Sequence, residues 1–449
     1  MKKNILCKLH KRRIPMKRRF LKKARRTVSI STSDVQEKVR NILFDIEHKR
    51  EDAATSYAKN IDEFSGNIIL SSDEILEACS KVSDKIKDDI QFSYENVRKF
   101  AEAQKATLSD FEIEIVPGFT AGQKYIPCNS VGCYIPGGRY SHVASAIMTV
   151  ATAKVSQCAH ITACSPPTSK NGINPAVIYT ADLCGADSIM VMGGAHAIAS
   201  MAFGLFGLPE ADILVGPGNQ YVAEAKRQLY GKVGLDMVAG PTDSLILADE
   251  FADKMIVATD LVGQAEHGYN SPVWLVTDDE KLARNVIDIV PRLIADLPSI
   301  NRENANAAWI DFGEVILCDS RESMAETADE YAPEHLTVQT RDLKWWLSRL
   351  KCYGSLFLGE ETTVAFGDKV SGTNHVLPTA RSSRYTGGLS VHKYMKAVTW
   401  QKASREGSKK MAQAAARISR AEGMEGHART ADIRLQKYFP NAKFDLYHK

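Results

Sequence analysis

The feature that most constrains the fold of this chain is a repeated pattern of short apolar segment, turn rich in glycine or proline, and helix-like segment. It recurs between residues 130 and 250, where the apolar segments are 131–135, 160–164, 188–192 and 213–215. Strands that alternate with helices favour a parallel sheet, because each parallel pair needs a crossover connection. A second set of strand-like segments follows at 245–247, 273–276, 314–318, 336–338 and 355–358. The sequence therefore predicts an α/β protein with two Rossmann-like, parallel-sheet domains.

The segments on either side of this pattern are helical in character. From residue 33 to about 105, apolar residues recur every three or four positions, as in Val35, Val39, Leu43 and Ile46. The period changes to two at residues 111–116, and the stretch 393–436 returns to helical spacing with no clear strand signal. We therefore divide the chain into a leader at 1–32, an N-terminal helical region at 33–110, α/β domains at 111–250 and 251–385, and a helical C-terminal tail at 386–449.

The leader is strongly basic and distorts the overall charge. The chain has 57 Lys and Arg against 54 Asp and Glu, but thirteen of the basic residues lie within 1–26, before the first acid, Asp34. The remainder is acidic, so we expect no nucleic-acid partner beyond what the leader alone could attract. We predict that the leader is disordered. It fits a mitochondrial transit segment, an RNA-attracting tail or, the interpretation we favour, sequence upstream of a true start at Met16.

Cysteine usage and hydropathy indicate where the protein works. The nine cysteines include no Cys-x-x-Cys pair, which favours a reducing compartment and buried thiols. No run of about 18 uncharged apolar residues, the length needed to cross a bilayer, occurs in the chain. We therefore predict a cytoplasmic protein with no membrane partner.

Two Glu-His dipeptides carry the chemistry. In Gln264-Ala265-Glu266-His267, a helix would place Gln264 and His267 on one side, where an amide oxygen and an imidazole could share a cation. Zinc prefers about four ligands, and Asp368 and His427 are candidates for the others. The alternative is a hydrogen-bonded structural histidine, which is the commoner role of a single His.

The second dipeptide, Glu334-His335, follows Pro333, which predicts a turn directly before the acid and the base. A fixed turn that holds both groups suits proton transfer. The alternative is an exposed helix start with Glu334 near the positive end of the helix dipole.

The glycine turns are less specific: none has the Gly-x-Gly-x-x-Gly pattern, so on chemistry alone each favours an ordinary α/β turn over a nucleotide cradle.

Several of these motifs together resemble one family. They are the two Glu-His motifs, Gly367-Asp368, the segment 373–379 and the turn Gly216-Pro217-Gly218-Asn219. Taken in their order along the chain, from about residue 33 to 436, these motifs resemble the histidinol dehydrogenase family. The resemblance implies an intertwined homodimer and an NAD-linked oxidation of an alcohol through an aldehyde to a carboxylate, with two NAD used in succession.

The resemblance also implies roles for individual residues. One zinc ion would be bound by Gln264, His267, Asp368 and, from the partner subunit, His427. His335 would be the general base and Glu334 the residue that activates water. The cofactor contacts would be Tyr134, His196 and Asn219, although the family usually has Gln at the position of His196.

Departures from the family pattern point to the substrate. Lys369 stands where the family has Tyr, and Thr242-Asp243 replace a Ser-Glu pair. A lysine beside a zinc ligand would repel cationic histidinol and attract an anion. The segments 352–369 and 387–400 are more similar to the sulfopropanediol 3-dehydrogenase branch, which oxidises 2,3-dihydroxypropane-1-sulfonate to sulfolactate.

We therefore predict a substrate site from residues around the metal. Its candidate members are Thr242, Lys369, His375, Glu422, Arg139 and His142. Lys369, with Arg139 or His142, would hold the sulfonate, while the alternative for each is a solvent-facing charge. Glu422 matches the acid that meets the substrate amine in histidinol dehydrogenases, and here it could hold the hydroxyl instead.

Three functional interpretations remain open from the sequence. The first is the sulfopropanediol dehydrogenase, and the second is a histidinol dehydrogenase with unusual pocket residues. The third is a zinc-stabilised binding protein that has lost the chemistry. The presence of Glu334 and His335 argues against the third, because a protein without catalysis has no chemical need for a water-activating acid beside a base.

Overall fold

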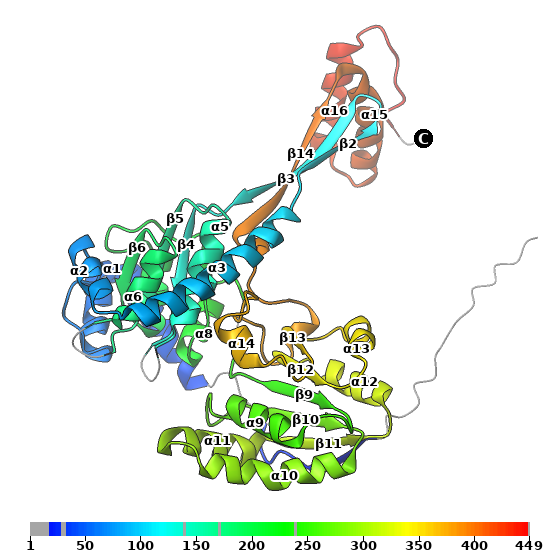
Figure 1. Cartoon of the computed structure of the whole chain (residues 1–449). Coiled ribbons are helices and arrows are strands. Elements are labelled where there is room, and N and C mark those ends of the chain that lie inside the picture. The colour runs from blue at the N-terminus through cyan, green and yellow to red at the C-terminus, as the bar shows by residue number, and fades with distance from the viewer. Residues whose placement is uncertain (1–17, 28–32, 138–140, 169–171, 238–239, 448–449) are drawn as a thin grey trace, which may run out of the picture. The chain divides into compact units, whose positions relative to one another are not determined.

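A computed structural model describes residues 18–27, 33–137, 141–168, 172–237 and 240–447 (Figure 1). The chain forms two compact units. The first contains Met1–Glu102 and Asn129–Tyr394, and the second contains Ala103–Cys128 and Met395–Lys449. Each unit is described by itself below.

The first unit begins with a parallel sheet whose strand order is β6-β5-β4-β7-β8. The strands are β4 (Ser130–Tyr134), β5 (His160–Ser165), β6 (Ser188–Val191), β7 (Ile213–Val215) and β8 (Gly234–Leu235). Numbered along the chain, this order is 3-2-1-4-5, so the winding direction reverses between β4 and β7. In sheets of this kind, ligands bind outside the carboxyl ends of the strands at that reversal.

Helices connect and cover this sheet. They are α1 (Ser33–Ile61), α2 (Ser72–Ser80), α3 (Asp84–Ala106), α4 (Val143–Ala146), the π-helical segment Ile147–Ala151, α5 (Thr152–Val155), α6 (Pro175–Leu183), α7 (Gly194–Ala202) and α8 (Gln220–Leu229). The buried apolar side of α1 packs on α7 and α8, where Val39, Ile46 and Ile198 share one core. The predicted N-terminal helical region is therefore confirmed as α1, α2 and α3.

The turn between β7 and α8 requires glycine at its first position. Gly216 has a φ of 106°, and a Cβ atom there would lie 2.0 Å from the carbonyl oxygen of Tyr134 at the end of β4. Its N–H donates to the Asp236 carboxylate over 2.7 Å. The turn is thus drawn against the end of β4, which brings Asn219 to the same edge of the sheet as Tyr134.

The second sheet of the first unit has the order β1-β11-β10-β9-β12-β13. Its strands are β1 (Arg18–Lys22), β9 (Ser244–Ala248), β10 (Val273–Thr277), β11 (Glu314–Cys318), β12 (His335–Gln339) and β13 (Ser355–Leu358). All neighbours are parallel except β1, and the parallel strands repeat the winding of the first sheet. The prediction of an α/β fold with parallel sheets is confirmed.

Helices cover both faces of the second sheet (Figure 1). On one face, α9 (Lys254–Ala265), α10 (Glu280–Ala295) and α11 (Ser299–Phe312) share a core with the strands. On the other, α12 (Arg321–Tyr331) and α13 (Leu343–Arg349) do the same. The chain then continues through α14 (Val364–Lys369) and two short 3-10 segments, Ser382–Arg384 and Val391–Tyr394.

Strand β1 overturns part of the prediction for the leader. Residues 18–22 pair antiparallel with β11, and the Arg18 guanidinium binds the Glu330 carboxylate at 2.8 and 3.0 Å. The Lys22 ammonium donates to the carbonyls of Trp309 and Gly313. The prediction that residues 1–32 are disordered is therefore wrong for this stretch, while residues 1–17 and 28–32 lie outside the described part of the chain. A chain that started at Met16 would still contain β1.

We expect removal of residues 1–22 to destabilise the protein, whereas removal of residues 1–15 should not. Phe20 and Leu21 are half-buried against the two cores of the second sheet, so losing them should cost about 2 kcal/mol. Thermal unfolding of the two truncated proteins, side by side with the full chain, measures this difference. Equal unfolding midpoints for both truncations would show that β1 contributes nothing to stability.

The second unit is an antiparallel sheet with two helices. Its strands, in the order β14-β3-β2, are β2 (Phe111–Val116), β3 (Phe119–Pro127) and β14 (Met395–Ala403), and its helices are α15 (Arg405–Ala421) and α16 (Glu425–Tyr438). The helices pack through Ala412, Ala416 and Leu435. Gly122 faces Trp400 so closely that a Cβ atom would lie 2.4 Å from its indole ring.

This unit corrects two predicted boundaries. Residues 386–449 are not purely helical, because β14 lies within them, and residues 111–127 belong to its sheet rather than to the first α/β domain. A third boundary also moves, since β9 belongs to the second parallel sheet although it precedes residue 251.

Two other expectations concern cysteines and membranes. The eight described cysteines are all free, and six of them are buried, as predicted. No helix within the described ranges has the length and apolar character needed to cross a bilayer.

Candidate functional site

Glu334 and His335 lie at the amino end of β12 in the first unit. Helix α12 ends at Ala332, which adopts a left-handed conformation with a φ of 47°, and Pro333 then leads into the strand. Both side chains are buried, and His335 Nδ1 lies 3.7 Å from Glu334 Oε2. Neither ring nitrogen of His335 has a hydrogen-bond partner among the described residues. The predicted turn is present, and it holds an acid and an unsatisfied base side by side.

The electrostatics of this pair are set by burial and by neighbouring carboxylates. Burial raises the pKa of Glu334 to about 8, with the nearby charges of Asp243 and Asp368 adding to the rise. Burial alone would lower the pKa of His335, but Glu334 and Asp368 outweigh it and raise the pKa to about 9. His335 Nε2 lies 3.6 Å from Asp368 Oδ1, and the imidazole holds the pKa of Asp368 below its usual range despite burial. Glu334, His335 and Asp368 therefore titrate as one coupled group.

Asp243 is a member of the site to which the sequence analysis assigned no role, although it noted the Thr242-Asp243 pair as a departure from the family pattern. It directly precedes β9, and its Oδ1 accepts the Glu334 N–H over 2.7 Å. Its own N–H donates to Glu334 Oε2 over 3.2 Å. Burial raises the pKa of Asp243 to about 6. Its position after Pro241-Thr242 carried no signal of this contact, which joins two strands 91 residues apart.

Three of the four predicted metal ligands lie in the first unit. Gln264 is in the last turn of α9, and the His267 N–H donates to its carbonyl over 3.4 Å, so the helical turn extends as predicted. His267 Nε2 lies 4.0 Å from Asp368 Oδ2. Gln264 Oε1 is buried without a hydrogen-bond partner among the described residues. An unsatisfied amide oxygen, an imidazole and a carboxylate fit the donor set of a zinc site.

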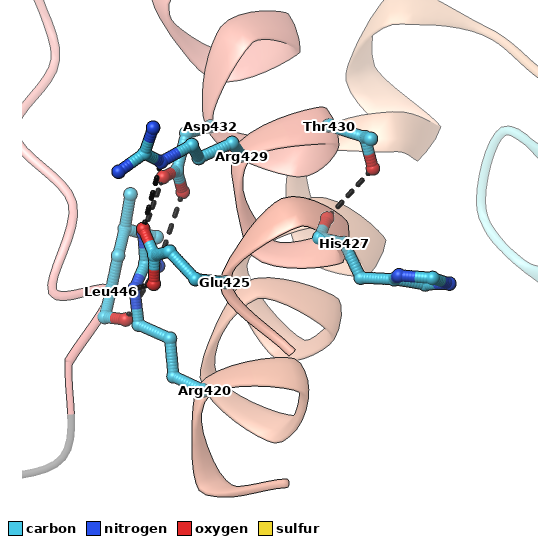
Figure 2. Close-up of polar contacts among 7 residues, drawn as sticks. All are labelled: Arg420, Glu425, His427, Arg429, Thr430, Asp432 and Leu446. Carbon is cyan, nitrogen blue, oxygen red and sulfur yellow. Dashed lines mark hydrogen bonds and ion pairs between the residues drawn. The ribbon is translucent and has the colours of Figure 1, made fainter. Parts of the chain in front are cut away.

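The fourth predicted ligand, His427, lies in the second unit on the first turn of α16. Figure 2 shows its ring directed away from the cluster in which Arg420 binds Glu425 and Asp432. Glu422, at the end of α15, is exposed, as is His427. Within the described ranges no three His, Cys, Asp or Glu side chains gather closely enough to hold a metal by themselves. The zinc assignment therefore stays a prediction that needs both an amide ligand and a ligand from the second unit.

Lys369 and two histidines, His142 and His375, lie near the predicted metal ligands of the first unit. The charge of Lys369, which is exposed at the end of α14, contributes to lowering the pKa values of His142, His267 and His375. Burial is the larger cause in each case and takes the pKa of His142 to about 4. His375 Nε2 lies 3.0 Å from the Ser145 hydroxyl, and its Nδ1 lies 2.7 Å from the Asp368 carbonyl.

The remaining substrate candidates of the first unit are Thr242 and Arg139. Thr242 is half-buried directly before Asp243, whose N–H donates to Glu334. Arg139 lies outside the described residues. Among the substrate candidates of the first unit, the structure thus gathers Lys369, His142 and His375 around Asp368.

The predicted cofactor residues lie at the carboxyl edge of the first sheet. Tyr134 ends β4, Asn219 caps α8, and His196 is in the first turn of α7. The Asn219 side-chain oxygen accepts the N–H groups of Tyr221 and Val222, which leaves its amide NH₂ as the group that can donate to a ligand. Tyr134 and Asn219 flank the reversal between β4 and β7, where a dinucleotide would meet the N-terminus of α8.

His196 is held by Asp62, a second residue that the sequence analysis missed. Its Nε2 lies 2.8 Å from Asp62 Oδ2, which also accepts the Gly193 N–H over 2.8 Å. The Gly194 N–H donates to the Tyr134 hydroxyl over 3.1 Å. This His–Asp pair braces the turn before α7, so Nε2 of His196 is engaged by the protein.

One known protein family matches the chain over most of its length. The family described as histidinol dehydrogenase matches residues 25–435. The chain belongs to this family. It is therefore an oxidoreductase of the histidinol dehydrogenase family, and the resemblance stated from the motifs is confirmed. The matched range contains both Glu-His motifs.

Two curated relatives and one crystal structure illustrate the match. The chain is 66% identical to sulfopropanediol 3-dehydrogenase of Ruegeria pomeroyi, over 95% of this chain and 98% of that protein. It is 36% identical to histidinol dehydrogenase of Methanocaldococcus jannaschii, over 89% and 92%. The crystal structure of histidinol dehydrogenase from Elizabethkingia anophelis superposes with a TM-score of 0.86 at 34% identity, covering 92% and 94%. The histidinol dehydrogenase fold is thus shared by 92% of the chain.

Proposed function

We propose that the protein is a zinc-dependent, NAD-linked dehydrogenase that oxidises 2,3-dihydroxypropane-1-sulfonate to sulfolactate in two hydride transfers. The observation that carries this substrate assignment is the positive charge of Lys369, the residue after Asp368, whose field reaches His142, His267 and His375. An anionic alcohol would be attracted to this lysine, whereas cationic histidinol would be repelled. The 66% identity to a protein named sulfopropanediol 3-dehydrogenase supports the same assignment.

The proposed chemistry divides between the two members of the Glu-His pair. His335, in its deprotonated form, accepts the proton of the primary hydroxyl as the first hydride leaves its carbon, and it releases this proton to solvent before the second oxidation. Glu334, as the carboxylate, takes a proton from the water that adds to the aldehyde. His335 then accepts the hydroxyl proton of the hydrate as the second hydride leaves. Zinc, held by Gln264, His267, Asp368 and His427, would polarise the reacting oxygen. Glu422 would hold the second hydroxyl.

Two molecules of NAD, bound in succession near the reversal between β4 and β7, would each accept one hydride. Tyr134 and Asn219 lie there, and the N-terminus of α8 favours the negative charge of a pyrophosphate. His196 would contribute by bracing the turn rather than through Nε2, which faces Asp62.

Lys369 should determine affinity for the anion. We expect Lys369→Met to raise KM for the sulfodiol about 10- to 100-fold, because one charge-assisted hydrogen bond is lost, with a smaller change in kcat. Lys369→Arg, which keeps the charge, is the matched control. The carbonyl of Lys369 accepts the Ser93 hydroxyl, and this backbone contact survives both substitutions. An unchanged KM in Lys369→Met would remove Lys369 from the substrate site.

We also propose that the protein acts as a homodimer. Strand β2 of the second unit exposes Phe111, Ile113 and Ile115 on one face, each about half accessible. Such a row of apolar side chains on an edge strand favours burial against another protein surface. Since the predicted ligand His427 also lies in this unit, a second copy of the chain is the partner that the proposed zinc site requires. Sedimentation of the purified protein tests this: a monomer at all concentrations would contradict it.

One assay separates the proposed substrate from the alternatives. NADH formation is followed with the sulfodiol and with histidinol under the same conditions. Faster turnover of the sulfodiol supports the proposal, and much faster turnover of histidinol would establish the second interpretation. If neither substrate reacts with zinc and NAD present, a non-catalytic zinc-binding protein becomes the better account.

A further inference from the structure

We propose that Asp243 is a positioning residue that holds Glu334 in the orientation needed for water attack, an inference that builds on the proposed role of Glu334. Asp243 and Glu334 exchange two hydrogen bonds. The Asp243 carboxylate accepts the Glu334 N–H over 2.7 Å, and the Glu334 carboxylate accepts the Asp243 N–H over 3.2 Å. This reciprocal pair fixes both the backbone and the carboxylate of Glu334.

The two residues are placed for this exchange by the sheet. Asp243 precedes β9, Glu334 precedes β12, and the two strands pair in parallel with Ser244 opposite His335. The His335 N–H donates to the Asp243 carbonyl over 3.2 Å. Asp243 thereby contacts both members of the proposed catalytic pair, while β9 itself contributes no group to the reaction.

A third contact joins Asp243 to the segment that follows the predicted substrate residue His375. Asp243 Oδ2 accepts the N–H of Ala380, which has a left-handed conformation with a φ of 52°. Each carboxylate oxygen of Asp243 therefore binds one backbone N–H, which offsets the cost of burying the charge. An apolar side chain of similar size would leave both N–H groups unsatisfied.

The arrangement predicts that a change at Asp243 slows the oxidation of the aldehyde more than the oxidation of the alcohol. Because Glu334 Oε2 is held by the Asp243 N–H and lies 3.7 Å from His335 Nδ1, its other oxygen is the one left to receive a proton from water. Water enters only the oxidation of the aldehyde. Misplacing Glu334 should therefore slow the aldehyde step more than the alcohol step, which depends on His335.

Asp243 borders an existing cavity, so a smaller side chain at this position would not create a separate, closed void. Asp243 lines a cavity of about 460 Å³ together with Pro241 and Ala380. Alanine at this position would enlarge that cavity, and Asp243→Asn keeps the size and one acceptor oxygen. Asp249 provides a matched control at the other end of β9, because its carboxylate accepts the Arg341 N–H from the segment after β12 over 3.1 Å.

The test compares Asp243→Ala, Asp243→Asn and Asp249→Ala. We expect Asp243→Ala to lower the rate with supplied aldehyde at least tenfold more than the rate of the alcohol step, measured in a single turnover. Asp243→Asn should recover part of this loss, and Asp249→Ala should leave the ratio of the two rates unchanged. Equal losses in both steps, or none, would overturn the positioning role.

A crystal structure of the Asp243→Asn or Asp243→Ala protein provides a readout that needs no substrate. We expect the Glu334 carboxylate to move from its place beside His335. If the carboxylate stays in place, Asp243 does not position it. Inactivity of the unmodified enzyme with every substrate would count against the proposed function instead, and the crystal structure would still decide the role of Asp243.

Discussion

Replacing His335 with alanine is expected to lower kcat by about 10²- to 10⁴-fold, the usual contribution of a general base, while the bound zinc and the fold are retained. His335 is buried, and both of its ring nitrogens lack hydrogen-bond partners among the described residues. Such a ring stabilises the fold little through polar contacts, so its loss should affect the reaction more than stability.

The measurement is kcat together with the metal content of the purified protein. His48→Ala is a suitable control, since His48 is exposed on α1 and bonds only locally, with its Nδ1 2.8 Å from the Phe44 carbonyl. It should leave both quantities unchanged. Loss of zinc from His335→Ala would instead make His335 a metal ligand and overturn its role as the base.

Replacing His267 with alanine should produce the opposite pattern, in which the metal is lost first. Removal of residues that only orient a ligand already weakens metal affinity about 10- to 100-fold, so removal of a ligand should cost at least about 100-fold. The side chain of His267 is 38% exposed, and its Nε2 faces Asp368 at 4.0 Å. Its truncation should therefore leave the fold intact.

Glu266→Gln distinguishes the two members of the first dipeptide. Glu266 accepts a hydrogen bond from the Asn301 amide over 2.9 Å, so it has a structural partner of its own. We expect this variant to keep zinc and activity. Full zinc occupancy in His267→Ala, measured by elemental analysis after dialysis, would contradict the predicted ligand set.

The parts of the fold that follow from local patterns were predicted, and the parts that depend on distant pairing were not. Strands such as β5 and β10 are buried on both faces and stand out as short apolar runs before turns. Strand β1 is different, because its sequence Arg18-Arg19-Phe20-Leu21-Lys22 resembles a charged leader. Only pairing with β11, some 295 residues later in the chain, makes it a strand.

Strand β14 was hidden for a related reason. Lys396 and Lys402 lie on the same face of the strand as Val398 and Trp400, so polar and apolar residues do not alternate, and the segment lies next to two helices with similar composition. Its strand character comes from β3, which pairs with it along its whole length. The period of the sequence was weak evidence because the sheet is exposed.

The candidate site shows the same division between local and distant information. The two Glu-His motifs were found from the sequence because each is contiguous. Asp62 was missed, and the contacts of Asp243 were not foreseen, since an aspartate that binds backbone N–H groups from another strand or turn has no local pattern. Asp62 holds His196, and Asp243 holds Glu334, so each aspartate orients one neighbour.

The proposed four-electron oxidation of the sulfodiol can be tested by the stoichiometry of NADH formation. A limiting, known amount of 2,3-dihydroxypropane-1-sulfonate is converted with excess NAD, and NADH and sulfolactate are quantified at completion. The proposal predicts two NADH and one sulfolactate for each sulfodiol consumed. One NADH with accumulation of the aldehyde, or no NADH at all, would contradict it.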